Sequence, residues 1–125
     1  MKKIIKTNKS PKAIGTYSQG TIYENLVFTS GQICIHPKTG ELVNDNFKNE
    51  VRQVLDNLNG ILISGGSGLN NILKLTVFLT DFSFFDELNE VFIEYFPIDP
   101  PARSAVEVSG LPLNVRVEIE AIGKI

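Results

Sequence analysis

Arg103 and a row of charged residues downstream of it are the side chains whose sequence context best suits chemistry. Two consecutive prolines precede Ala102 and Arg103, and their rings fix φ and remove two N–H donors, so the approach to Arg103 is extended. A guanidinium presented in this way can receive a carboxylate in a bidentate fork. Residues 115–121 alternate apolar and polar side chains, which places Glu118 among the charged residues on one face of a predicted strand. That polar face either lies in water or lines a site.

Taken alone, these patterns favour a structural interpretation over a functional one. Arg103 would be a surface residue, and the charged strand face would be solvated, with cross-strand ion pairs worth ~0–1 kcal/mol each. Tyr17 would be a core aromatic with a satisfied hydroxyl group, and Asn89 would face solvent from a helix. Gly31 would mark a bulge or a close backbone approach.

Three other features that suggest chemistry are explained better by structure. The glycine-rich residues 65–68 follow a predicted helix and precede a predicted strand, which reverses the order of a phosphate-binding loop, so we interpret them as a helix stop. His36 is the only histidine and Cys34 the only cysteine, too few ligands for a transition-metal site. Cys34 lies in an apolar run, and no partner histidine is evident in the sequence to activate it as a nucleophile. We therefore expect no metal, no cofactor and no catalytic cysteine.

Composition limits the class of protein. A chain of 125 residues falls in the range of one domain, here residues 1–125, with one hydrophobic core. Twelve basic and fourteen acidic residues give a net charge of −2, which disfavours non-specific nucleic-acid binding. The single cysteine cannot close an internal disulfide, and residues 1–6 lack the apolar run of a signal peptide. No apolar run approaches the ~20 residues of a membrane-spanning helix. We expect a cytoplasmic protein with no membrane contact.

The hydrophobic pattern predicts the elements that would position the candidate residues. β-prone runs alternate or cluster apolar residues, and helical runs repeat them every three or four positions. The predicted strands are residues 21–23, 26–29, 32–35, 73–80, 103–108 and 115–122. The predicted helices run from Asn46 to the glycines at 65–66, and from a Ser83 cap to the residue before Pro97. In the fourth strand, Leu73 and every second residue after it would face the core.

The resulting order β-β-β-α-β-α-β-β predicts a two-layer α+β fold. Two helical crossovers lie beside hairpins, so the sheet should be mixed, with both helices on one face. No helix is then left to cover the other face. That face must meet water or another subunit.

Three segments together resemble a known family. They are Tyr17-Ser18-Gln19-Gly20, Thr29-Ser30-Gly31-Gln32, and Pro-Pro-Ala-Arg-Ser at 100–104 with the later Val-Glu-Val, Leu-Pro and Val-Glu-Ile-Glu-Ala-Ile runs. In this order and spacing, the chain resembles the RidA (YjgF) family of reactive-intermediate deaminases over essentially its whole length. The resemblance implies a chorismate-mutase-like fold and a homotrimer with active sites between subunits.

The resemblance also implies an activity and assigns roles to residues. The family hydrolyses 2-imino acids, which pyridoxal-phosphate-dependent dehydratases release, to 2-keto acids and ammonia, as in 2-iminobutanoate/2-iminopropanoate deaminase. Arg103 matches the family's carboxylate-binding arginine, and Glu118 its water-orienting glutamate. The other matching substrate-binding positions are Tyr17, Ser30, Gly31, Asn89 and Ala105. Many members carry Cys or Thr where this chain has Ala105, which leaves substrate preference open.

Two alternative functions remain from other classes. The first is a non-catalytic protein that binds a carboxylate metabolite in the same intersubunit pocket. The second is a ribonuclease or translation inhibitor, against which the acidic balance, the single histidine and the apparent lack of a basic stripe argue.

Overall fold

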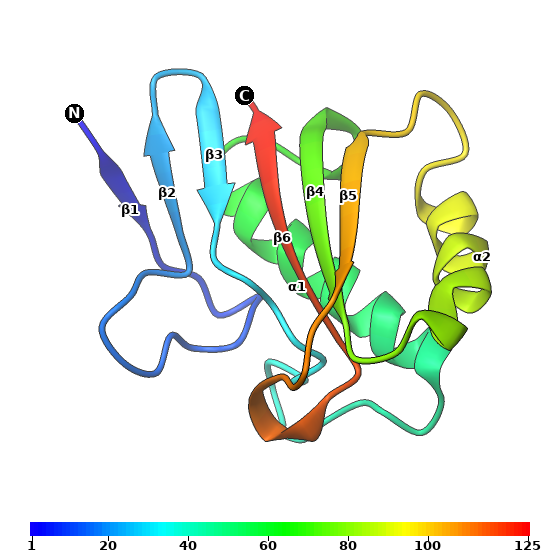
Figure 1. Cartoon of the computed structure of the whole chain (residues 1–125). Coiled ribbons are helices and arrows are strands. Elements are labelled where there is room, and N and C mark those ends of the chain that lie inside the picture. The colour runs from blue at the N-terminus through cyan, green and yellow to red at the C-terminus, as the bar shows by residue number, and fades with distance from the viewer.

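A six-stranded mixed sheet forms one layer of the structure, and two α-helices form the other (Figure 1). The computed structural model describes all 125 residues. The helices are α1 (Phe47–Ser64) and α2 (Phe85–Tyr95). The strands are β1 (Lys3–Ile5), β2 (Gly20–Tyr23), β3 (Leu26–Thr29), β4 (Ile72–Leu79), β5 (Ala102–Glu107) and β6 (Val117–Lys124). Their order across the sheet is β1-β2-β3-β6-β4-β5, and only β4 and β5 are parallel. The predicted α+β class, with both helices on one face, is confirmed.

The ends of the helices follow from local chemistry. Asn46 caps α1, because its Oδ1 accepts a hydrogen bond from the backbone N–H of Asn49 at 2.9 Å. The helix ends at Ser64, and Gly66 then adopts a φ of 88°, which glycine tolerates best. The predicted Ser83 cap of α2 is wrong. Asp81 caps a short 3₁₀ turn before α2 and accepts the Ser83 N–H at 2.8 Å.

The order of elements along the chain matches the prediction, and β2 and β3 lie at the predicted residues 21–23 and 26–29, but the third N-terminal strand is not the predicted one. β1 at Lys3–Ile5 pairs with β2 and was not predicted, because only Ile5 of its three residues faces the core. Residues 32–35 do not form a strand. They make one bridge to β6, between Gln32 and Ile119, and one bridge between Ile35 and Leu42. This segment belongs to an irregular connection between β3 and α1.

β4 corrects one detail of the predicted core. Leu75, Val77 and Leu79 are fully buried beneath the helices, as their alternation predicts. Leu73 is 46% exposed, because a register shift between Ile72 and Lys74 turns Ile72 toward the core in its place.

Arg116 does not share the polar face of β6 with Glu118. It precedes the first residue of β6, so the alternation of the strand does not fix its side chain. Its Nε donates to Oε1 of Glu50 at 2.7 Å, and Glu50 lies fully buried on α1. The other carboxylate oxygen of Glu50 accepts the N–H groups of Arg116 at 2.7 Å and Val117 at 3.2 Å. A buried carboxylate requires such partners, which draws Arg116 toward the helices.

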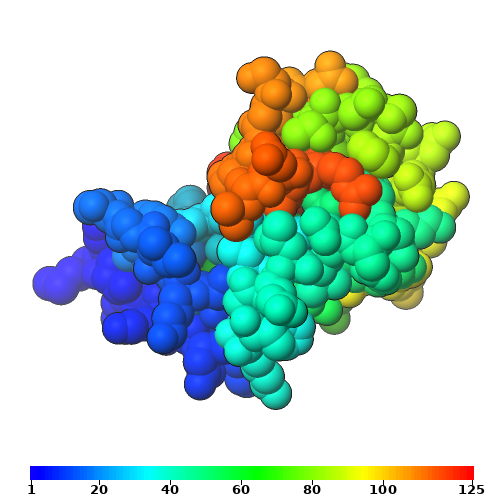
Figure 2. Space-filling view, turned by 90° about the horizontal axis from the view of Figure 1, so that it is seen from below, coloured from blue at the N-terminus to red at the C-terminus, as the bar shows by residue number.

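The second face of the sheet has no helix over it (Figure 1). The register places Ile4, Phe28, Glu118 and Val106 on this open face, and the three apolar side chains among them are 57%, 38% and 42% exposed. Seen from below in Figure 2, the N-terminal segment projects beside the segment around residues 31–45.

Neither α1 nor α2 has the length and the apolar composition that a membrane-spanning helix needs.

Candidate active site

A cavity of about 530 Å³ on the open side of the sheet gathers four of the predicted site residues. Tyr17, Ser30, Gly31 and Glu118 all line it. We call it the Glu118 pocket. Three segments far apart in sequence therefore meet there: the loop between β1 and β2, the end of β3, and β6.

The pocket exists because β3 and β6 separate. They pair regularly only as far as Phe28 and Ile122. At the next residue of each strand, the N–H of Ala121 donates to the side-chain hydroxyl group of Thr29 at 2.9 Å, where regular pairing would use a backbone carbonyl. Regular pairing returns only for the bridge between Gln32 and Ile119. The intervening backbone at Gly31 thus lies beside Glu118 without being bonded into the sheet.

Glu118 occupies the space that a side chain at residue 31 would need. A Cβ atom placed on Gly31 would lie 3.0 Å from Cδ and 3.2 Å from Cγ of Glu118, with Oε2 nearer still. Ordinary contacts of this kind begin at 3.4 Å. Gly31 therefore allows a close approach, and the group that approaches it is the candidate catalytic carboxylate.

The surroundings of Glu118 make its charged form less favourable than that of an ordinary surface glutamate. Burial raises its pKa above the usual glutamate range, and the neighbouring Glu120 carboxylate raises it further. A carboxylate whose pKa moves toward the working pH is a better general base and general acid than an ordinary surface glutamate.

Tyr17 and Ser30 contribute to one wall of the Glu118 pocket. Tyr17 is 53% exposed, so it is not a core aromatic, and its hydroxyl oxygen accepts the N–H of Ile14 at 3.3 Å. The hydroxyl group of Ser30 donates to the carbonyl of Ser18 at 2.5 Å. The Ser30 N–H also bonds the carbonyl of Gln19, which ties the two segments together.

Gln19 anchors this wall, and the sequence analysis gave it no role. Its buried side-chain Nε2 donates to the carbonyls of Thr7 at 2.9 Å and Pro11 at 2.7 Å, and its Oε1 accepts the Thr7 N–H at 2.7 Å. These bonds hold residues 7–11 against the pocket. The signal was present, since Gln19 belongs to the Tyr-Ser-Gln-Gly motif.

Arg103 lies in a second cluster, against α2. Its Nη1 donates to Oδ1 of Asn89 at 2.8 Å. The guanidinium carbon lies 5.3 Å from the ring centre of Phe85 and 5.2 Å from that of Phe92. Phe85, Asn89 and Phe92 are spaced to share one face of the helix, so α2 supplies both the aromatic rings and the amide. The other N–H donors of Arg103 have no partner within the chain.

The sheet separates the two clusters. Arg103 pairs with Leu75 of β4, and Glu118 pairs with Phe78 of the same strand. Paired residues point to the same face, whereas residues three apart on one strand point to opposite faces. Because Leu75 is buried beneath the helices, Arg103 is on the helix side and Glu118 on the open side. One chain alone does not bring both onto one small ligand.

Comparison with known proteins identifies the family. Residues 7–125 match the Endoribonuclease L-PSP family, which is the RidA/YjgF family. A RutC family protein of Pyrococcus horikoshii is 51% identical over 122 residues, covering 98% of this chain and 97% of that protein. The 2-iminobutanoate/2-iminopropanoate deaminase of Rattus norvegicus is 42% identical, covering 98% and 89%. The structure of E. coli TdcF with bound serine superposes with a TM-score of 0.92 at 41% identity, covering 98% of each chain.

The chain belongs to the RidA (YjgF) family. The resemblance seen in the sequence is thereby confirmed, together with the fold that it implied. Within the family pattern, Ala105 of this chain is half-buried on β5, and its methyl group packs against the core. It carries no side-chain heteroatom that could contact a ligand.

The side chains that could bind a metal ion lie apart from one another in this RidA-family chain. No group of three or more His, Cys, Asp or Glu side chains is placed to hold a metal ion. Nδ1 of His36 accepts the Lys38 N–H at 3.1 Å within its own turn. Cys34 is fully buried, and burial raises its pKa to about 11, which disfavours the reactive thiolate.

Proposed function

We propose that this protein is a hydrolytic deaminase that converts 2-imino acids to 2-keto acids and ammonia. The observation that carries the proposal is the half-buried Glu118 carboxylate, with its raised pKa, held over Gly31 in a pocket shared with Tyr17 and Ser30. The name of the rat relative supports the reaction. The structure of the relative TdcF with bound serine supports a small amino-acid-like ligand.

The chemistry needs a water molecule and a base. Glu118 acts as the base. The carbon of the protonated imine is already electrophilic, so the ionised carboxylate accepts a proton from water as the water oxygen adds, which gives a neutral carbinolamine. The carboxyl group then gives that proton to the amine nitrogen. As ammonia leaves and the ketone forms, the carboxylate accepts the proton of the hydroxyl group and releases it to solvent. General acid–base assistance of this kind contributes roughly 10²–10⁴ in rate. That is sufficient for a substrate that also hydrolyses unaided.

Arg103 would hold the substrate carboxylate from a second copy of the chain. Its free guanidinium donors fit a bidentate carboxylate, but within one chain the sheet lies between Arg103 and Glu118. β5 is an edge strand, so Arg103 lies at the border of the molecule. We propose a homotrimer in which Arg103 of one subunit faces the Glu118 pocket of its neighbour, with the open sheet face buried between subunits.

The remaining site residues would act around these two. Asn89 orients the Arg103 guanidinium, and Tyr17 and Ser30 shape the wall of the pocket through their hydroxyl groups. Ala105 contributes only its backbone, because its methyl group is apolar.

The activity is tested by supplying 2-iminopropanoate or 2-iminobutanoate from a dehydratase reaction and timing the appearance of keto acid. Arg103→Ala should lose charge-assisted bonds, which lowers substrate capture by about ten- to a hundredfold, and Arg103→Lys should restore little. Glu118→Gln should keep affinity for a stable keto-acid analogue but lose turnover. A chelator should leave the wild-type rate unchanged. Full turnover by Glu118→Gln would remove Glu118 from the mechanism.

Mixed oligomers test whether the site is shared between subunits. Light scattering coupled to size exclusion should give the mass of a trimer. Arg103→Ala and Glu118→Gln subunits, each impaired alone, should regain activity when they are unfolded, mixed and refolded together, because some interfaces would again hold both intact residues. A monomer, or mixtures no more active than their parents, would contradict the shared site.

The same assays distinguish the two alternative functions. A carboxylate-binding protein without catalytic activity would bind the keto-acid analogue but leave imine hydrolysis at its unaided rate. A ribonuclease would degrade RNA in a manner that Glu118→Gln abolishes. Either result, without imine turnover by the wild type, would replace the deaminase proposal.

A further inference from the structure

The Glu118 pocket presents an electrostatic problem for the proposed substrate. The side chains that line it include two carboxylates, Glu118 and Glu120, and the substrate is itself a carboxylate. Arg103 of the same chain lies beyond the sheet. Among the pocket-lining residues, Lys12 is the only cation. An anion that approaches this pocket therefore meets two negative charges and one positive charge from the same subunit.

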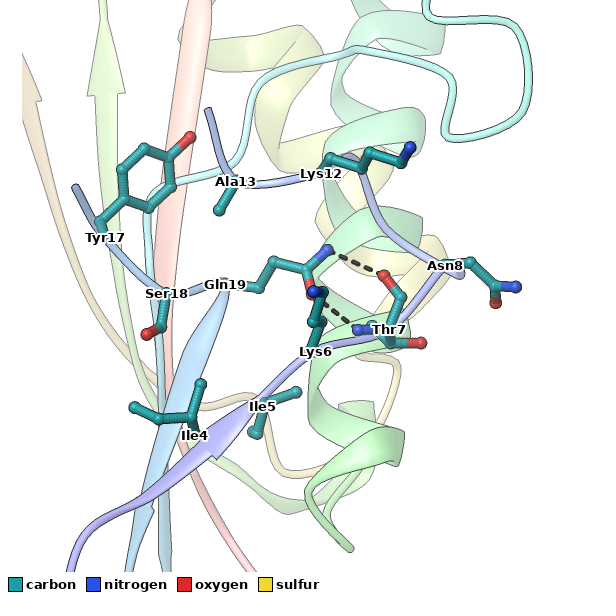
Figure 3. A pocket seen from close by; sticks show the side chains of 10 residues that line it. All are labelled: Ile4, Ile5, Lys6, Thr7, Asn8, Lys12, Ala13, Tyr17, Ser18 and Gln19. Carbon is teal, nitrogen blue, oxygen red and sulfur yellow. Dashed lines mark hydrogen bonds between the residues drawn. The ribbon is translucent and has the colours of Figure 1, made fainter. Parts of the chain in front are cut away.

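Lys12 also belongs to a larger groove next to the pocket. This groove has a volume of about 810 Å³, and its lining includes Lys6, Lys12, Asn8 and Ser18. Figure 3 shows the lysines carried by the segment that runs from β1, over Gln19, toward Tyr17. Lys12, Tyr17 and Gln19 line both cavities, so the groove and the pocket adjoin. We call the larger cavity the lysine groove.

The N-terminal segment that lines the groove carries positive charges and no negative ones. Five of the twelve basic residues are lysines within the first twelve positions, and the first acidic residue is Glu24. None of these five lysines forms an ion pair within the chain, since the three salt bridges involve Lys48, Arg52 and Arg116. The net charge of −2 thus conceals a lysine-rich N-terminal segment, of which Lys6 and Lys12 line the groove. Unpaired cations around a concave surface concentrate small anions there.

We propose that the lysine groove is a capture site for small carboxylates, and that Lys12 passes the substrate from it into the Glu118 pocket. The inference rests on the proposed function for the identity of the substrate. Lys6 and Lys12 offset the repulsion from the two pocket carboxylates during approach, before Arg103 of a neighbouring subunit engages the ligand. The expected role is in association and ground-state binding, because neither lysine carries the proton transferred in the reaction.

Kinetics of charge variants test this role. Lys12→Gln should lower kcat/KM about two- to fivefold, and Lys6→Gln with Lys12→Gln should lower it further, with kcat unchanged. Wild-type kcat/KM should fall as salt is raised, and the double variant should be less sensitive to salt. Lys12→Arg keeps the charge and should restore the wild-type value. Lys38→Gln is the matched control, because Lys38 is exposed, unpaired and lines neither cavity.

A binding measurement separates this proposal from the deaminase proposal. NMR titration with 2-oxobutanoate needs no turnover, and it should show perturbed resonances around Lys12 that weaken in the double variant. If the wild type binds in this way but hydrolyses no imine, the groove is supported and the deaminase proposal fails. If the wild type is active but the double variant matches it in kcat/KM, salt dependence and titration, the groove proposal is wrong. Preferential binding of a short single-stranded RNA at these lysines would likewise overturn the assignment to small carboxylates.

Discussion

Replacing Gly31 by alanine tests whether the position of the Glu118 carboxylate controls activity. The new methyl group would lie 3.0 Å from Cδ of Glu118, where ordinary contacts begin at 3.4 Å, and Oε2 is closer still. Gly31 does not adopt a positive φ, so its backbone suits alanine. The conflict is therefore confined to the end of one flexible side chain.

The expected magnitude follows from that geometry. The carboxylate must move by about 1 Å to clear the methyl group, and a displacement of about 1 Å can cost on the order of a hundredfold in rate. The side chain can rotate away toward the open cavity, so the free energy of unfolding should change by less than about 1 kcal/mol. We therefore expect the Gly31→Ala variant to fold and to keep about 1% of the wild-type turnover.

Single-turnover rates on imine generated in place, measured beside urea unfolding, provide the assay. Gly68→Ala is the matched control, because nothing lies within 4 Å of a Cβ atom at that position. It should keep wild-type activity. Wild-type turnover by Gly31→Ala would refute the assigned position of Glu118 in the reaction. A loss of activity that only parallels a loss of stability would show that the glycine serves folding instead.

Four further substitutions test electrostatic interactions at the site and in the core. Glu120→Gln removes a charge that raises the pKa of Glu118, so the acidic limb of the kcat/KM profile should move to lower pH. Because the fold disfavours charged Glu118, Glu118→Gln should be more stable than wild type at neutral pH. In urea unfolding, this difference should vanish below the pKa of an unfolded glutamate. Asn89→Ala frees the Arg103 guanidinium and should raise KM about fivefold while kcat stays the same, as steady-state kinetics would show. Glu50→Gln weakens three bonds to a buried carboxylate at the start of β6 and should lower the free energy of unfolding by about 3 kcal/mol in the same urea assay.

Local sequence patterns were sufficient to predict most of the helices and strands. Apolar spacing and the glycines at its end predict α1, and alternation predicts the buried face of β6, because each depends on neighbours within one turn or a few residues of strand. The prediction failed for β1, since three residues carry too little pattern and the strand depends on pairing with β2. It failed for residues 32–35 because a β-prone composition does not reveal whether a partner edge is available.

The motifs by themselves determined the family and named the candidate residues of the site, because residue types and their order can be compared without knowledge of contacts. Only the tertiary structure decided how these residues are grouped. The separation of β3 from β6 brings Gly31 beneath Glu118, and the sheet register places Arg103 on the opposite face. The partner of Arg116 was also decided by packing, since the buried Glu50 lies 66 positions away in the chain. Strand pairing and burial are long-range properties, and one residue of register exchanges the two faces of a sheet, so no local pattern could have specified them.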